Sequence, residues 1–106
     1  MELFKLEIYI PESHLKDLQK ALQSSGAGRL GNYEACLAYS RVKGTWKPLD
    51  GARPYIGEVG ALSVEDELKV EVNVDKARLR QTIQAIRDIH PYEEPLINVI
   101  SLYDDY

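Results

Sequence analysis

The chain has 106 residues, of which 44% are hydrophobic and 28% charged, and its formal net charge is −4. A chain of this length is expected to form one domain, residues 1–106, with a modest core. Because 17 acidic residues outnumber 13 basic ones, nucleic acid is not expected as a partner. Since no apolar run of about 18 residues is present, we expect no segment that spans a membrane.

The first residues and the cysteine content bear on the cellular compartment. Residues 1–10 alternate charged and apolar side chains, whereas a signal peptide places an apolar run after a basic region. Cys36 has no second cysteine with which to form an internal disulfide, as is usual in reducing compartments. We therefore expect a cytoplasmic protein.

The first elements in the chain are predicted to be a strand and a helix. In residues 3–10 apolar and polar side chains alternate, which predicts a strand with one buried face. Pro11 suits the first turn of a helix, an apolar stripe at helical spacing follows, and Gly26 suits a left-handed cap. We predict this helix near residues 12–25.

The middle of the chain is unusual in composition, because all seven glycines and the only tryptophan lie between Gly26 and Gly60. Residues 35–43 favour a strand, and residues 45–49 a short one after a break. Because a structureless loop of this length is uncommon in a small domain, we predict a strand followed by an extended hairpin excursion. The excursion carries Trp46, which we expect to pack either on its own domain or on a second subunit.

The last part of the chain predicts a strand, a helix and a strand. Residues 67–74 alternate cleanly, and Asp75 is a suitable N-cap for a helix near residues 76–89. This helix must end before Pro91, which disfavours a helical residue in front of it. The final strand, near residues 96–103, is apolar on both faces, so we expect both faces to be covered.

This order of elements predicts an α+β domain of the ferredoxin-like βαββαβ type. We expect a four-stranded antiparallel sheet with both helices on one face and the hairpin excursion between the second and third strands. The predicted core consists of Phe4, Leu6, Ile8, Leu18, Leu22, Val70, Val72, Ile83, Ile86 and Ile100.

The usual catalytic signatures are missing from the sequence. Residues 26–31 (GAGRLG) imitate a dinucleotide fingerprint in part, but they follow a predicted helix and not a strand. A helix cap that runs into tight turns is the favoured interpretation of this segment. Cys36 lies in an apolar alternation with no histidine close in sequence, which favours a structural thiol over a reactive one.

The segment His90–Pro95 (HPYEEP) gathers a histidine, a phenol and two carboxylates between prolines. One interpretation is a proton-handling or divalent-metal site whose ligands are His90, Glu93 and Glu94. The interpretation that the spacing favours is a helix C-terminus followed by a stiff connection, because neighbouring carboxylates do not easily face one cavity. Apart from this divalent metal ion, no cofactor is indicated.

Three segments, taken together, resemble the insert domain of the Nif-three-like family (NGG-one-interacting factor three-like). They are residues 26–33 (GAGRLGNY), 48–60 (PLDGARPYIGEVG) and 90–95 (HPYEEP), in that order. That insert is similar to the copper-tolerance protein CutA and to the PII signal proteins. The resemblance covers nearly the whole chain and implies a ferredoxin-like sheet that assembles as a homotrimer.

In full-length members of that family the insert lies within a larger domain, which supplies the histidine and acidic ligands of a paired-metal site. This sequence matches the insert alone, so the resemblance implies a stand-alone insert domain without the family's hydrolase or cyclohydrolase activity. What it implies instead is a non-enzymatic assembly or regulatory module that binds a small molecule between subunits. The alternative is a small metal-binding protein that uses His90 and nearby carboxylates.

We place the expected ligand site where the His90–Pro95 turn would approach residues 57–60 and residues 32–33. Glycines in such turns let the backbone approach a ligand closely, and a few polar groups orient the ligand in a concave pocket. The rival interpretation is that these turns only hold each other in place. The expected ligand-binding residues are Asn32, Tyr33, Gly57, Glu58 and Tyr92.

Overall fold

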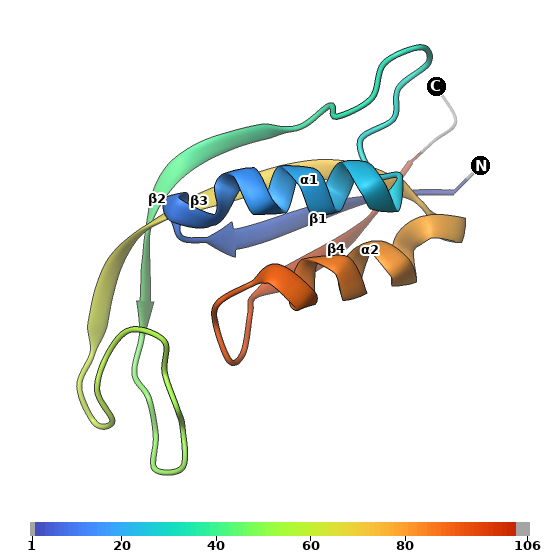
Figure 1. Cartoon of the computed structure of the whole chain (residues 1–106). Helices are drawn as coiled ribbons and strands as arrows, with labels where there is room; N and C mark the ends of the chain where they lie inside the picture. Colours follow the sequence, from blue (N-terminus) through green and yellow to red (C-terminus); the bar gives the residue numbers. More distant parts are fainter. Residues whose placement is uncertain (1, 104–106) are drawn as a thin grey trace.

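A four-stranded sheet carries two α-helices side by side on one of its faces, in a computed structural model that describes residues 2–103 (Figure 1). The sheet order is β2-β3-β1-β4, and every neighbouring pair of strands is antiparallel. The predicted α+β, ferredoxin-like fold is therefore confirmed. In chain order the elements are β1 (Leu3–Ile10), the 3-10 turn η1 (Glu12–His14), α1 (Leu15–Ser25), β2 (Ala38–Trp46), β3 (Ser63–Asp75), α2 (Lys76–Ile89) and β4 (Ile97–Leu102).

Both ends of α2 and the C-terminal end of α1 lie at residues whose chemistry suits those positions, whereas α1 begins at Leu15, after the 3-10 turn, without a side-chain cap. Gly26 closes α1 in the left-handed conformation, with φ of 90°, and its N–H donates to the carbonyl of Gln23. Asp75 caps α2, because its carboxylate accepts a hydrogen bond of 3.0 Å from the backbone N–H of Arg78. The C-cap of α2 is His90, whose backbone is already extended in front of Pro91.

The core lies between the helices and the facing side of the sheet. Cross-strand pairs such as Leu6 with Val72 and Ile8 with Val70 place their side chains under α1 and α2. The buried apolar residues are Leu6, Ile8, Ile10, Leu18, Leu22, Ala27, Leu68, Val70, Val72, Val74 and Ile86.

Three residues of the predicted core lie elsewhere. Ile100 pairs with Lys5 and therefore points to the sheet face away from the helices, where it is 41% exposed. Ile83 is half-buried and outside the central cluster, and Phe4 packs against the edge of that cluster. Thr82, next to Ile83 in the chain, takes the buried position on α2.

The strands β2 and β3 form a longer ribbon than the sequence predicts. β2 runs without a break through Gly44, and β3 begins at Ser63 and not near residue 67. The reason is the ladder between them, in which Gly44 pairs with Glu65 and Thr45 with Val64. Backbone pairing thus extends the ribbon through residues of low strand propensity, and the paired strands extend past the helices (Figure 1).

The other face of the sheet is not covered by either helix (Figure 1). The expectation that β4 is covered on both sides is not met within the described part of the chain, because Val99 and Ile100 are exposed. Both edge strands, β2 and β4, are also open to pairing with other groups. No helix among residues 2–103 is long and apolar enough to cross a membrane.

Candidate functional site

A cavity of about 680 Å³ lies where the β2–β3 ribbon meets the turn between α2 and β4. The sheet contributes Tyr9, Val42 and Glu67, and the connection between β2 and β3 contributes apolar residues such as Pro54. The turn after α2 contributes Tyr92 and the residues that follow it. A concave, largely apolar space of this size is typical of sites for small molecules.

Aromatic rings cluster around Tyr92 at this cavity. The ring centroid of Tyr92 lies 5.4 Å from that of Trp46, 6.1 Å from that of Tyr55 and 4.9 Å from that of His90. The indole N–H of Trp46 donates a hydrogen bond of 3.2 Å to the carbonyl of Ile56, which fixes the ring. Trp46 therefore packs on its own domain, which is one of the two arrangements expected from the sequence.

A second contact joins the two loops that wall the cavity. The backbone N–H of Arg53 donates a hydrogen bond of 2.9 Å to a carboxylate oxygen of Glu93. Arg53 belongs to the connection between β2 and β3, and Glu93 to the turn between α2 and β4. This bond and the Trp46–Tyr92 contact hold the hairpin excursion against the turn.

Glu67 of β3 is a carboxylic acid in the interior of this region. The residue is only 6% exposed, and its side chain lies over Gly44 of the neighbouring strand. A Cβ atom at Gly44 would collide with the carboxylate, so the glycine makes room for it. Within residues 2–103 the carboxylate makes no ion pair, and it accepts a hydrogen bond of poor geometry from the hydroxyl of Tyr92. A buried acid without a cationic partner is uncommon in proteins.

The phenol of Tyr92 is the second buried polar group of the cavity. Its oxygen is shielded from solvent, and within residues 2–103 its polar neighbour is the Glu67 carboxylate, at a geometry outside the normal range for a hydrogen bond. Burial raises the pKa of Tyr92 well above its usual range, and the adjacent Glu67 carboxylate raises it further. The phenol therefore stays protonated and is available as a hydrogen-bond donor.

His90 is buried, at 8% exposure, and both of its ring nitrogens are engaged. Nδ1 accepts a hydrogen bond of 3.1 Å from the backbone N–H of Tyr92, so Nε2 carries the proton and donates to the carbonyl of Tyr9 at 2.7 Å. Burial lowers the pKa of His90, and the imidazole is held neutral. A histidine bound in this way has no free lone pair to offer a metal ion.

The three residues of the predicted metal site do not converge as a ligand set. Glu93 and Glu94 line the cavity, whereas the two nitrogens of His90 face backbone groups. Among residues 2–103, no three His, Cys, Asp or Glu side chains form a group that could hold a metal ion. Because both ring nitrogens of His90 bind backbone groups, the segment fits the interpretation that the spacing favours, a helix C-terminus followed by a stiff connection.

The predicted ligand site is brought together only in part. Tyr92 lines the cavity and Gly57 lies beside the Trp46 ring, but Glu58 is exposed and outside the lining. Asn32 and Tyr33 lie at the opposite end of the sheet (Figure 1), in the loop that follows α1.

The expectation that residues 32–33 meet the His90–Pro95 turn is therefore wrong, and chain direction explains the error. The loop after α1 is tied to the sheet where Gly28 donates to the carbonyl of Asn73, close to the start of β1. The turn after α2 lies at the end of β1, where His90 contacts Tyr9.

Glu67 and Gly44 are the residues of the cavity that sequence reasoning missed. An acidic residue at a strand end usually lies in solvent, and nothing in the sequence marks Glu67 as an exception. The available signal was Gly44 itself, which the sequence analysis treats as a break between two strands, since a glycine within strand-like sequence often marks a close approach of another group. Only the register, which places Gly44 beside the strand of Glu67, identifies that group.

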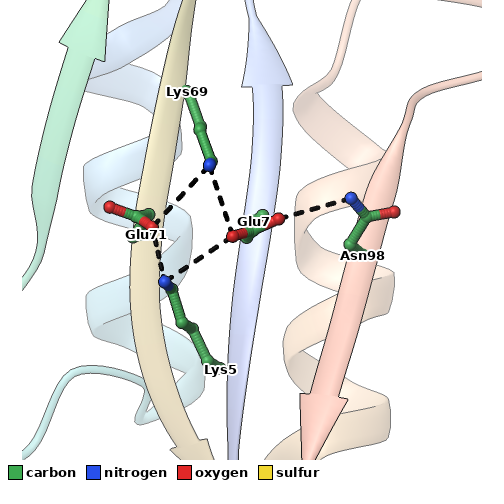
Figure 2. A network of polar contacts seen from close by, with 5 residues as sticks. All are labelled: Lys5, Glu7, Lys69, Glu71 and Asn98. Carbon is green, nitrogen blue, oxygen red and sulfur yellow. Dashed lines mark hydrogen bonds and ion pairs between the residues drawn. The ribbon is translucent and has the colours of Figure 1, made fainter.

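Beside the cavity, the uncovered sheet face carries a network of charges (Figure 2). Lys5 lies 2.5 Å from Glu71 and 3.6 Å from Glu7, and Lys69 lies 3.4 Å from Glu7. The amide of Asn98 on β4 donates to Glu7, and this bond and the two lysines lower the pKa of that carboxyl. Two acids and two bases thus compensate one another at the centre of the open face.

Comparison with known proteins found relatives for almost the whole chain, although no family model matches it. A protein of Halalkalibacterium halodurans named GTP cyclohydrolase 1 type 2 homolog is 38% identical over 103 residues, which are 97% of this chain and 28% of that protein. The chain therefore spans little more than a quarter of the length of this curated relative.

Solved structures with the same fold include a Bacillus cereus protein related to NIF3. It is 32% identical with a TM-score of 0.85, and the match covers 97% of this chain and 26% of that one. The PII-like protein CutA from Nostoc sp. PCC 7120 has a TM-score of 0.67 at 19% identity, over 96% of this chain and 81% of that one. At this identity the second likeness shows the fold alone.

Proposed function

On the premise that this chain is a NIF3-like domain with a CutA/PII-like fold, we propose that it is a non-enzymatic assembly or regulatory module. In this proposal the chain forms a homotrimer and binds a small molecule in the cavity between the β2–β3 ribbon and the His90–Pro95 turn. The observation that carries the proposal is this cavity of about 680 Å³, with buried polar groups at its base, beside an uncovered sheet face.

Self-assembly is supported by what the uncovered face exposes. Leu96 and Ile100, at or next to the edge strand β4, leave apolar side chains in solvent on this face. The charges at the centre of the open face are already paired, so a second subunit would not have to bring compensating charges to cover them. The number of subunits, three, follows the resemblance to CutA and PII.

The name of the curated relative does not assign an activity to this chain. The match accounts for 28% of that relative, so an activity of the whole relative is not assigned to these residues. The metal-binding alternative requires His90 to exchange both of its backbone hydrogen bonds for a metal ligand. For that reason we propose a ligand-binding module.

A thermal-shift screen of metal ions, nucleotides and small metabolites at constant ionic strength tests this function. We expect at least one organic compound to raise the melting temperature of the unmodified protein. Tyr55→Ala, which removes a ring of the cavity that is 52% exposed, should abolish that response. Tyr39→Ala is the matched control, since Tyr39 is 53% exposed and lies outside the cavity.

Two results of the screen would count against the proposal. One is the absence of any stabilising compound, or a response that persists in Tyr55→Ala. The other is a large response to a metal ion that disappears in His90→Ala, which would establish the metal-binding alternative.

A further inference from the structure

The base of the cavity combines a negative charge with the faces of aromatic rings. Glu67 is buried and has no cationic partner among residues 2–103, and its polar neighbour is the hydroxyl of Tyr92. A buried carboxylate without a counter-ion costs free energy, because one phenol does not replace the water that the charge loses. Such a group, lining a cavity, indicates a ligand that supplies the missing charge.

The rings around Tyr92 limit what that ligand can be. Trp46 and Tyr55 lie 5.4 Å and 6.1 Å from Tyr92, and all three side chains line the cavity together with Glu67. Aromatic faces attract cations through their quadrupole, and Trp and Tyr are the strongest such partners. A carboxylate next to several aromatic rings is the combination that binds alkylated ammonium groups.

The other charges near the cavity also favour a positively charged ligand. Two lysines line the cavity, Lys43, which is paired with Asp66 at 2.5 Å, and Lys47, and the three lining carboxylates of Glu67, Glu93 and Glu94 outnumber them. Glu93 and Glu94 lie in the wall formed by the turn. A phosphate or carboxylate ligand would therefore meet net negative charge, whereas a cation would be attracted.

We propose that this cavity binds an organic cation, a small molecule whose alkylated or primary ammonium group lies against the Glu67 carboxylate and the faces of Trp46, Tyr55 and Tyr92. The inference rests on the proposed function, because it names the ligand class for the same cavity. The cavity volume of about 680 Å³ leaves room for a larger molecule behind the ammonium group. The Tyr92 hydroxyl, beside the Glu67 carboxylate, keeps that charge at the base of the cavity.

The fluorescence of Trp46, the only tryptophan, reports directly on this site. The titrants are choline and n-butylammonium as chlorides, with 3,3-dimethylbutan-1-ol as the uncharged isostere of choline and sodium chloride as the ionic-strength control. We expect at least one of the two cations to give a saturable change. The isostere should bind at least about tenfold more weakly, and sodium chloride should have no effect.

Glu67→Gln tests the carboxylate without changing the size of the side chain. This variant should weaken cation binding at least about tenfold and leave binding of the isostere unchanged. Glu65→Gln is the matched control, because Glu65 lies two residues away on the same strand and outside the cavity lining, and it should bind like the unmodified protein. If Glu67→Gln fails to fold, Gly44→Ala, which displaces the carboxylate, should give the same loss.

The result that overturns the inference is an absence of binding by both cations, or binding that the isostere or Glu67→Gln reproduces. If a different compound still gives the Tyr55-dependent thermal shift, only the inference fails and the proposed function stands. Light scattering of Glu67→Gln tests whether a basic side chain of a second copy, and not a small molecule, supplies the positive charge. An unchanged mass is expected, whereas a lower mass would identify a basic side chain of a second copy as the partner of Glu67 and overturn the small-molecule assignment.

Discussion

His90 illustrates at the scale of one residue how a motif that suggests metal chemistry can serve a structural purpose. Its ring joins the end of β1 to the turn after α2 through hydrogen bonds to Tyr9 and Tyr92. Both bonds require the neutral ring with its proton on Nε2. The stability that this residue confers must therefore depend on pH.

We predict that the free energy of unfolding falls as the pH drops below about 6.5, the ordinary pKa of histidine, toward the lowered pKa of folded His90. The sign follows because the unfolded chain binds the proton in this range and the folded chain does not. Urea unfolding at about pH 7.5 and about pH 5.5 measures the slope. His90→Gln should reduce this change of the unfolding free energy with pH, and His14→Gln should not. The same change in His90→Gln as in the unmodified protein would contradict the prediction.

The environment of Thr82 leads to a second prediction at this scale. Its hydroxyl is buried on α2 without a hydrogen-bond partner. Thr82→Val replaces the hydroxyl with a methyl group of similar size and should raise the free energy of unfolding by about 1 kcal/mol. Chemical denaturation checks this, with Thr45→Val on strand β2 as the same exchange at an exposed hydroxyl. A destabilised Thr82→Val would show that the hydroxyl has a partner in solution.

At the scale of elements, the two helices and β1 were predictable because local signals coincide. Apolar spacing, the Gly26 cap and the Asp75 cap all agree, and the structure ends α1 at Gly26 and begins α2 after Asp75, whereas α1 begins at Leu15, after a 3-10 turn over residues 12–14. The ends of β2 and β3 were not predictable, because their extension depends on pairing between the strands. Gly44 and Glu65 are poor strand formers alone and become strand residues through the ladder.

The cap of α2 can be tested by Asp75→Ala. The variant loses the hydrogen bond to the Arg78 N–H and the ion pair with the Arg78 side chain. We expect a loss of about 1 kcal/mol, within the usual range for removal of an N-cap. Thermal or urea unfolding measures it, and Asp88→Ala, at the exposed end of the same helix, is the control. A loss in Asp75→Ala no greater than in the control would show that the cap does not stabilise α2.

At the scale of the whole molecule, the candidate site shows where sequence reasoning ends. The aromatic residues Trp46, Tyr55 and Tyr92 stand out in the sequence, and the structure brings them to one cavity. The position of residues 32–33 depends on which end of the sheet each loop reaches, and the buried state of Glu67 depends on strand register. Neither property is encoded in any single segment.

The uncovered sheet face allows the assembly to be disrupted without loss of the fold. Ile100→Lys places a charge on that face, where the side chain of an isolated chain is already 41% exposed. We therefore expect little change in circular dichroism but dissociation of the assembly, because a buried lysine in an interface is costly. Leu30→Lys, in the loop after α1, should leave the assembly unchanged. A fully assembled Ile100→Lys protein would show that this face is not the interface.

Self-association is the central claim of this account, and the mass in solution tests it most directly. Light scattering coupled to gel filtration at micromolar concentration should give three times the 12.0 kDa of one chain. The same value should persist on dilution across the column, since a face that joins apolar side chains to internally paired charges can form a stable assembly. A single peak of 12.0 kDa would contradict the claim.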